Sequence, residues 1–216
     1  MSEIYVDGVQ GLVKNAIVYD LDESCIACRY PMKVGELKNE GIISYQTANR
    51  LGKTPIGCGE DNFLNGIRVA FDLTLSNKAW VEMERYHFMD FVSSQSTMHR
   101  ILEFNLDTQC NRYVDTVVKD MLKDKIAEYH RLQNLPPAEN EETAKRRADI
   151  MAELYLKILY NIPSGFRLTA RMTTNYRQLK TIYYQRKNHR LPEWREFCKW
   201  IETLPKFKKM VLGVDE

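Results

Sequence analysis

Alternation of hydrophobic and polar residues predicts two strands in this chain. From Asn65 to Leu75 the apolar residues recur at every second position, so they lie on one face of an extended segment. The segment from Leu12 to Asp20 alternates more weakly and predicts another strand nearer the N-terminus. The predicted sheet is therefore small.

Hydrophobic residues at helical spacing cover far more of the sequence. Helices are predicted over Asp22–Tyr30, Ala79–Phe88, Tyr113–Gln133, Thr143–Tyr160, Thr173–Lys187 and Glu193–Thr203. Three loops are predicted from composition. Glycine predominates in Gly52–Gly59, hydroxyl side chains predominate in Phe91–Thr97, and proline and charged residues predominate in Leu135–Glu142. The pattern indicates an α+β fold, a helix-rich single domain with a small antiparallel or mixed sheet.

The predicted helix Thr173–Lys187 carries polar side chains in an unusual place. At about 100° per residue, the eleven steps from Asn175 to Arg186 leave these two side chains about 20° apart. Two apolar residues lie between them on the same stripe, and His189 falls near it if the helix continues. Burying a charge without a partner is costly, so this arrangement suits a site for a planar, anionic, hydrogen-bonding ligand better than it suits a core.

Arg186 is therefore expected to be at least partly buried and to need a partner. The carboxylates close to it in sequence, Glu193 and Glu196, lie beyond a break at Pro192. If neither carboxylate reaches the guanidinium, the expected partner is a bound ligand.

Composition narrows the possible classes of protein. The chain has 216 residues, 44% of them hydrophobic, which suffices for one well-cored domain and is short for two. A net charge of +2 does not favour a dedicated nucleic-acid binder, so no nucleic-acid partner is expected. The N-terminus lacks the features of a signal peptide, and no window approaches the roughly eighteen apolar residues of a membrane span. We expect a cytoplasmic protein that does not enter a membrane.

Five cysteines, an odd number, indicate a reducing environment rather than a disulfide-stabilised fold. Cys25 and Cys28 form a C-x-x-C pair, whereas Cys58, Cys110 and Cys198 are scattered singly. A structural zinc site would need a second pair of ligands at matching spacing. The pair is therefore interpreted as small buried side chains on a short helix, and no metal is expected.

The C-terminal third resembles the flavin-dependent thymidylate synthases, the ThyX family. That family reads Leu-Pro, then Thr-x-Asn-x-Arg-x-Leu, then an arginine eleven residues after the asparagine. Ile162-Pro163, the stretch from Thr173 to Leu179 and Arg186 keep these spacings. The stretch from Asn188 to Glu196 is similar to the family's following segment but is one residue shorter before the histidine. The resemblance extends over most of the chain and implies one ThyX-like domain across residues 1–216.

The resemblance implies reductive methylation of dUMP, or of a related pyrimidine nucleotide. FAD would be the cofactor, with methylenetetrahydrofolate and NADPH as co-substrates. Arg186 would lie by the pyrimidine carbonyls and stabilise developing negative charge, while Asn175 and His189 would line the flavin site. Family members are homotetramers whose sites combine residues of several subunits, so apolar positions on the Thr143–Tyr160 helix are expected to contact a partner.

The family's middle motif, Arg-His-Arg followed after seven residues by Ser-x-Arg-Tyr, fits this chain in two registers. In the first, Arg85 and His87 form the basic cluster at the flavin, and the hydroxyl-rich run Ser94–Thr97 falls where the family has its phosphate loop. In the second, Met98-His99-Arg100 is the cluster, and Arg112-Tyr113 arrives two residues late. The first register keeps the family's spacing from the preceding strand and is favoured. It implies that the substrate-binding residues, besides Arg186, are Glu82, Ser94, Gln95, Ser96, His99 and Arg100.

Three positions depart from the family pattern. Asn65-Gly66 replaces a Glu-His pair at the flavin, Leu159 replaces an arginine at the substrate phosphate, and Glu82 replaces a glutamine at the pyrimidine. Because each change removes a contact, a second hypothesis stays open: a non-catalytic nucleotide-binding or regulatory protein that kept the fold and lost the flavin site. A third is that the helical spacing is coincidental.

Overall fold

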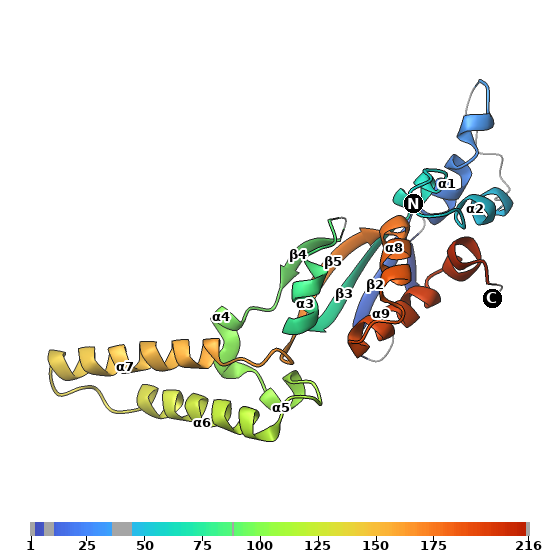
Figure 1. Cartoon of the computed structure of the whole chain (residues 1–216). Helices are drawn as coiled ribbons and strands as arrows, with labels where there is room; N and C mark the ends of the chain where they lie inside the picture. Colours follow the sequence, from blue (N-terminus) through green and yellow to red (C-terminus); the bar gives the residue numbers. More distant parts are fainter. Residues whose placement is uncertain (1–2, 7–10, 36–44, 88, 215–216) are drawn as a thin grey trace. The chain divides into compact units, whose positions relative to one another are not determined.

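The chain divides into two units, each with its own hydrophobic core, in its computed structural model (Figure 1). The first unit comprises Met1–Thr74, Glu82–Ser94 and Thr169–Glu216, and the second comprises Leu75–Val81 and Gln95–Leu168. The structure describes residues 3–6, 11–35, 45–87 and 89–214. Each unit is described by itself.

An antiparallel sheet is the centre of the first unit. Its five strands within the described residues are β1 (Glu3–Val6), β2 (Val13–Tyr19), β3 (Arg68–Ser76), β4 (Asp90–Ser94) and β5 (Arg167–Asn175). Their spatial order is β1-β2-β3-β5-β4. The Thr74 and Thr169 hydroxyl oxygens lie 2.8 Å apart, and the Tyr176 N–H donates to the Ile67 carbonyl at 3.0 Å. The central strands β3 and β5 therefore run antiparallel.

The first unit also contains several helices, one of which packs on the apolar face of β3. They are α1 (Leu21–Ala27), α2 (Gln46–Leu51), α8 (Tyr176–Arg186) and α9 (Pro192–Thr203), with 3-10 turns at Tyr30–Met32 and Asn62–Asn65 and a π-helical turn at Lys208–Leu212. The ring centroids of Phe71 on β3 and Trp200 on α9 are 4.8 Å apart, and Phe197 stacks on Trp200 at 5.2 Å. These aromatic contacts fix α9 against the sheet.

The second unit is dominated by two long helices that lie side by side (Figure 1). These are α6 (Thr116–Gln133) and α7 (Glu141–Tyr160); the shorter helices are α4 (Thr97–Arg100), a 3-10 turn at Ile101–Glu103 and α5 (Leu106–Gln109), and α3 (Asn77–Met83) crosses the boundary between the units. The core of this unit consists of Ile101, Leu106, Cys110, Leu122, Ile158 and Phe166.

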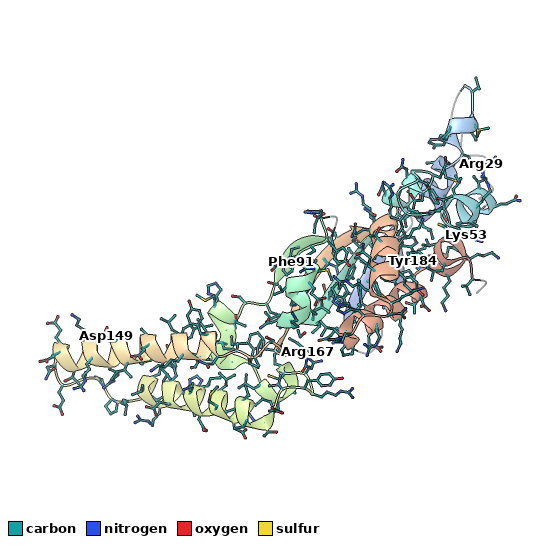
Figure 2. All side chains as sticks on the ribbon, in the orientation of Figure 1. Arg29, Lys53, Phe91, Asp149, Arg167 and Tyr184 are labelled. Carbon is teal, nitrogen blue, oxygen red and sulfur yellow. The ribbon has the colours of Figure 1, made fainter. Side chains whose placement is uncertain are left out.

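Helices α6 and α7 are covered only in part. Both are fully described, and their buried residues are Leu122, Leu132 and Ile158. The side chain of Asp149 is exposed on α7 (Figure 2). Exposed apolar side chains on the pair are Val117, Met121, Ile150, Leu156 and Tyr160. Among the described residues, no helix combines the length and apolar character needed to cross a membrane.

Most elements lie where the sequence patterns predicted them. The α+β class, rich in helix with a small antiparallel sheet, is confirmed. The two predicted strands are β2 and β3, and the long predicted helices are α6, α7 and α9. The predicted helix at Ala79–Phe88 ends early, at Met83, and the one at Asp22–Tyr30 is α1 followed by a 3-10 turn.

Two predictions were wrong, and they concern two strands that pair with each other, β4 and β5. The segment Phe91–Thr97, predicted as a loop, contains most of β4, and Thr173–Asn175, predicted as the start of a helix, is the end of β5. The two strands pair, with Asp90 opposite Thr173. Every residue of β4 is exposed, so no alternation marks it, and its backbone bonds to β5 decide the structure.

Candidate functional site

A pocket of about 850 Å³ opens where β3 begins and β5 ends; we call it the strand-end pocket. Its polar side chains are Asp20, Asn65, Arg68, Asp90, Thr173, Thr174 and Asn175, and Tyr19 adds an aromatic ring. The volume falls within the range of about 300–1,000 Å³ that is usual for small-molecule sites. The mixture of amides, hydroxyls, two carboxylates, one guanidinium and one aromatic side chain offers many hydrogen bonds to a planar ligand.

Gly66 lies in the wall of this pocket, at a position where a larger residue does not fit. A Cβ atom at this position would lie 2.1 Å from the Ser24 hydroxyl oxygen and 3.2 Å from the Ser24 Cβ. Ser24 is buried and donates to the Asp20 carboxylate at 2.8 Å, so it is held in place. The histidine that the ThyX pattern has at this position therefore has no room in this chain.

Asn175 lies at the junction of β5 and α8. It adopts an extended conformation and caps the helix, because its side-chain Oδ1 accepts the backbone N–H of Gln178 at 2.9 Å. The sequence analysis expected Asn175 to lie on the helical stripe with Arg186. The structure places Asn175 before the first turn of the helix and in the wall of the strand-end pocket instead.

A second pocket of about 490 Å³ adjoins the start of α8; we call it the helix-start pocket. It shares Asn65 and Asn175 with the strand-end pocket. Its other lining residues are Ile56, Gly57, Asp61, Arg177, Gln178 and Thr181. Because two residues line both pockets, the pockets are neighbours along the same edge of the sheet.

A buried ion pair lies at the helix-start pocket. Lys180 and Asp61 are each 1% exposed, and the Lys180 ammonium is 2.6 Å from the Asp61 Oδ2. The ammonium also donates to the carbonyls of Gly52 and Thr54, at 2.9 and 2.6 Å. All three of its protons are thereby used, so Lys180 ties the loop before Asp61 to helix α8.

Arg186 is held by side chains of the same unit. Its Nε donates to the Tyr86 hydroxyl at 2.8 Å, and its Nη1 donates to the Glu82 Oε2 at 3.0 Å. Its guanidinium carbon lies 4.7 Å from the ring centroid of Trp194. The Arg186 side chain is only 14% exposed, which agrees with the expected partial burial.

The carboxylate that pairs with Arg186 is therefore Glu82. The expectation that the partner would be a bound ligand if Glu193 and Glu196 did not reach the guanidinium is wrong, because a carboxylate far away in sequence takes that place. Glu82 also accepts from the Trp194 indole N–H at 3.2 Å. The His189 Nε2 lies 3.2 Å from the same carboxylate. The structure thus brings together three of the predicted site residues, Glu82, Arg186 and His189, in one cluster.

The predicted flavin residues Arg85 and His87 lie apart from both pockets. Helix α3 ends at Met83, so the two residues stand on the turn before β4 with exposed side chains. Neither lines the strand-end or the helix-start pocket. Tyr86, between them, faces inward and contacts Arg186.

The predicted phosphate loop is divided between the two units. Ser94 ends β4 in the first unit, whereas Gln95, Ser96, His99 and Arg100 belong to the second. Ser96 precedes the short helix α4, and Arg100 pairs with Glu103 on an exposed surface. The hydroxyl and basic side chains of this segment line neither described pocket.

The cysteine pair shows one buried and one half-buried thiol. Cys25 lies on α1, where burial raises its pKa to about 12, and burial also raises the pKa of Cys28. Elevated pKa values keep both thiols protonated near neutral pH. Within the described ranges, no group of three or more His, Cys, Asp or Glu side chains is arranged to hold a metal ion.

Sequence reasoning missed the charged residues at the pockets, although one of them carried a signal. Lys180 is four residues after the buried Tyr176 and adjoins the buried Leu179, so a single charge interrupts the apolar face of α8. A lysine in that place predicts a buried partner. The partner is Asp61, which lies far away in sequence, so the pattern around Lys180 could not predict it.

Comparison with known proteins gives a fold but no family membership. No protein-family model and no curated protein sequence matches the chain. Its structure is similar to thymidylate synthase X from Helicobacter pylori with FAD and dUMP, at a TM-score of 0.55 and 17% identity, covering 90% of this chain and 93% of that one. It is also similar to a second structure, flavin-dependent thymidylate synthase ThyX from Helicobacter pylori complexed with FAD and dUMP. The TM-score is 0.57 at 17% identity, and the match covers 98% of this chain and 97% of that one. The chain therefore has a ThyX-like fold.

Proposed function

We propose that this protein is a divergent flavin-dependent enzyme that carries out reductive methylation of dUMP or a related pyrimidine nucleotide. FAD is the proposed cofactor, with methylenetetrahydrofolate and NADPH as co-substrates. The observation that carries the proposal is the position of the strand-end pocket. Its walls include the run Thr173–Asn175, where the sequence resembles the flavin-binding family, and Asn65 and Gly66, which stand where that family has a Glu-His pair at the flavin.

The residues of the strand-end pocket are compatible with the ring system of a flavin. Amide groups of Asn65 and Asn175 and the hydroxyl of Thr173 offer hydrogen bonds to the edge of a planar heterocycle, and Tyr19 offers an aromatic surface. When bound, a reduced flavin supplies hydride. The carboxylates of Asp20 and Asp90 outnumber the one guanidinium of this pocket, Arg68, and disfavour the pyrophosphate there, so only the ring system is assigned to it.

Arg186 has the proposed electrophilic role toward the pyrimidine. Its Nε and Nη1 are used by Tyr86 and Glu82, whereas its Nη2 makes no hydrogen bond to the residues that the structure describes. A guanidinium oriented on one side and unused on the other can stabilise negative charge developing on a carbonyl oxygen. In this proposal Glu82, Tyr86 and Trp194 position Arg186 rather than contact the pyrimidine.

The proposal is tested on the purified protein and on Arg186→Gln. Wild-type protein is expected to show the visible absorbance of oxidised flavin and to form dTMP from dUMP with both co-substrates. Arg186→Gln should retain flavin but lose turnover by about a hundredfold or more, the usual effect of removing one charge-stabilising donor. Glu82 keeps its contacts to Trp194 and His189, so the variant should still fold. A colourless protein that forms no dTMP would contradict the proposed flavin-dependent activity.

A non-catalytic nucleotide-binding or regulatory protein is the second candidate, and a specific observation favours it. Gly66 leaves no room for the family's histidine, and Arg186 is already neutralised by Glu82. This candidate binds dUMP without flavin and without turnover. Titration of the colourless protein with dUMP therefore separates the two functions.

We also propose that the protein is a homo-oligomer, most simply a tetramer. Support comes from α6 and α7, which expose Leu156 and Tyr160 among other apolar side chains. The double substitution Leu156→Glu and Tyr160→Glu should dissociate the oligomer in light scattering, whereas the matched change Asp149→Lys on the same helix should not. A monomer mass for the wild type at micromolar concentration would contradict the proposal.

A further inference from the structure

We propose that Cys25 and Cys28 form a reversible disulfide by exchange with a small anionic disulfide, and that this bond acts on the strand-end pocket. The sequence analysis interpreted the pair only as small buried side chains. Both thiols are free in the structure. The proposal concerns a modification site, and it stands whether or not the protein binds flavin or a nucleotide.

The two thiols lie within one helical turn. Cys25 is on α1 and Cys28 is the residue at its C-terminal cap, so they are three positions apart. Cα atoms at that spacing in a helix are about 5 Å apart, which is within the roughly 4.4–6.8 Å that a disulfide spans. The Cys28 thiol also points back along the turn, because it donates to the Cys25 carbonyl at 3.0 Å. The bond can therefore form inside this turn.

Burial gives the two thiols different roles. Cys25 is 1% exposed, so a small disulfide in solution cannot reach it, whereas Cys28 is half-buried. Cys28 is therefore the thiol that reacts with the incoming disulfide. Cys25 needs to reach only the Cys28 sulfur, so it is the resolving thiol.

Two guanidinium groups favour an anionic disulfide at Cys28. Burial raises the pKa of Cys28, and the charges of Arg29 and Arg50 oppose this increase. The same positive charges attract a disulfide that carries carboxylates, such as glutathione disulfide. Because both thiols are mainly protonated near neutral pH, the exchange should be slow and should respond to sustained oxidation.

The exchange takes place in two balanced steps. The Cys28 thiolate attacks one sulfur of the small disulfide, whose S–S bond breaks, and the small thiolate that leaves takes up the proton that Cys28 lost. Cys25 then gives up its proton and attacks the Cys28 sulfur, and the second small thiolate leaves and takes up that proton. The protein loses two electrons and two protons, and the small disulfide gains them as two thiols.

Ser24 connects this turn to the strand-end pocket. The Cys28 N–H donates to the Ser24 carbonyl at 3.2 Å, in the turn that the new bond would tighten. The Ser24 hydroxyl donates to Asp20, and its oxygen leaves no room for a Cβ atom at Gly66. Asp20 and Gly66 both line the pocket. A shift of this turn therefore displaces two parts of the pocket wall.

The test exposes the full chain to glutathione disulfide and maps its thiols by alkylation and mass spectrometry. Cys58→Ser is the starting protein, because Cys58 is exposed and would itself form an adduct. A disulfide between Cys25 and Cys28, reversed by dithiothreitol, is expected, while the buried thiols of Cys110 and Cys198 stay reduced. If the pair stays reduced, or if Cys28 keeps a glutathione adduct although Cys25 is present, the proposal is overturned.

Two further variants, made in the same protein, test the roles of the two thiols. In Cys25→Ser only the first step can occur, so a stable glutathione adduct on Cys28 is expected. In Cys28→Ser neither an adduct nor a disulfide is expected, because Cys25 is buried. Reaction of Cys25 in that variant would contradict the assigned roles. Mapping of the Cys58→Ser protein leaves the pair intact, so it decides the site even if a variant does not fold.

Hydrogen exchange tests the connection to the pocket. The Leu64 and Gly66 amides donate to the carbonyls of Asp61 and Phe63 in the turn that packs on α1. Oxidation should raise their exchange rates by about threefold or more, because the displaced turn packs less well on them. The amides of α6 and the treated Cys28→Ser variant are the controls and should not change. Unchanged or slower exchange at Leu64 and Gly66 would overturn the connection.

Discussion

Replacing Lys180 with methionine is expected to lower the free energy of unfolding by about 3–5 kcal/mol, the typical cost of removing one partner from a buried ion pair. The substitution keeps a long side chain, so the main loss is electrostatic. Asp61 is 1% exposed and would keep only its contact to Arg177, and the carbonyls of Gly52 and Thr54 would lose their donor. Urea denaturation of both proteins measures the difference directly.

The control for this prediction is Lys199→Met on helix α9. Lys199 pairs with Glu196, and the two side chains are 66% and 45% exposed. An exposed pair of this kind contributes about 0–1 kcal/mol, so the control should change stability little. Equal effects of Lys180→Met and Lys199→Met would show that the buried pair does not stabilise the fold.

A compensating change separates the charge from the hydrogen bonds. In the double variant Lys180→Met and Asp61→Leu, no buried charge is left without a partner, and Arg177 becomes free on a partly exposed surface. Replacing a buried ion pair by apolar residues is often nearly neutral, so much of the lost stability should return. If none returns, the two carbonyls of Gly52 and Thr54 account for the effect.

Gly52→Ala is expected to lower the free energy of unfolding by about 1–3 kcal/mol or more, the next largest effect. The added methyl group would be forced against backbone atoms that have little room to move. An alanine Cβ would lie 2.5 Å from the Met210 carbonyl oxygen and 3.0 Å from the Ala48 carbonyl oxygen. The φ of Gly52 is −63°, so alanine is conformationally allowed and only the contacts oppose it. Helix α2 would have to move from the π-helical turn at Lys208–Leu212, and thermal melting would report this.

Gly57→Ala provides the contrasting case on the same loop. Gly57 has a φ of +94° and no atom within 4 Å of an added Cβ, so its cost is conformational alone. That cost is about 1–2 kcal/mol. A smaller loss for Gly52→Ala than for Gly57→Ala would contradict the close contact between Gly52 and Met210.

Local sequence pattern predicted the fold class and the long elements, because their periodicity is a local property. Strand β3 and helices α6 and α9 repeat apolar residues at the period of the element, and the structure contains them. Strand β4 was not predicted, since all of its residues are exposed and only pairing with β5 defines it. A segment fixed by a distant partner strand carries little signal of its own.

The candidate site was predicted only in part for a similar reason. Spacing singled out Asn175 and Arg186 as special, and both occupy defined places in the structure. The spacing did not predict that the two residues lie on different elements, because Asn175 ends strand β5 and caps helix α8, to which Arg186 belongs. Glu82 and Asp61, the partners of Arg186 and Lys180, are 104 and 119 residues away in sequence. Charge pairs over such distances follow from tertiary packing and have no local pattern.

The cap formed by Asn175 also decides which chemical groups the two pockets can recognise at that point. Its Oδ1 is occupied by the Gln178 N–H, so the amide cannot turn over without loss of about 1 kcal/mol of capping energy. The orientation leaves Nδ2 as the group that can face a ligand. Asn175 therefore presents Nδ2 as a donor, which favours ligands that place a carbonyl, a ring nitrogen or a phosphate oxygen against it, while Oδ1 keeps one further lone pair. An amino group presented at the same place would face another donor and be rejected.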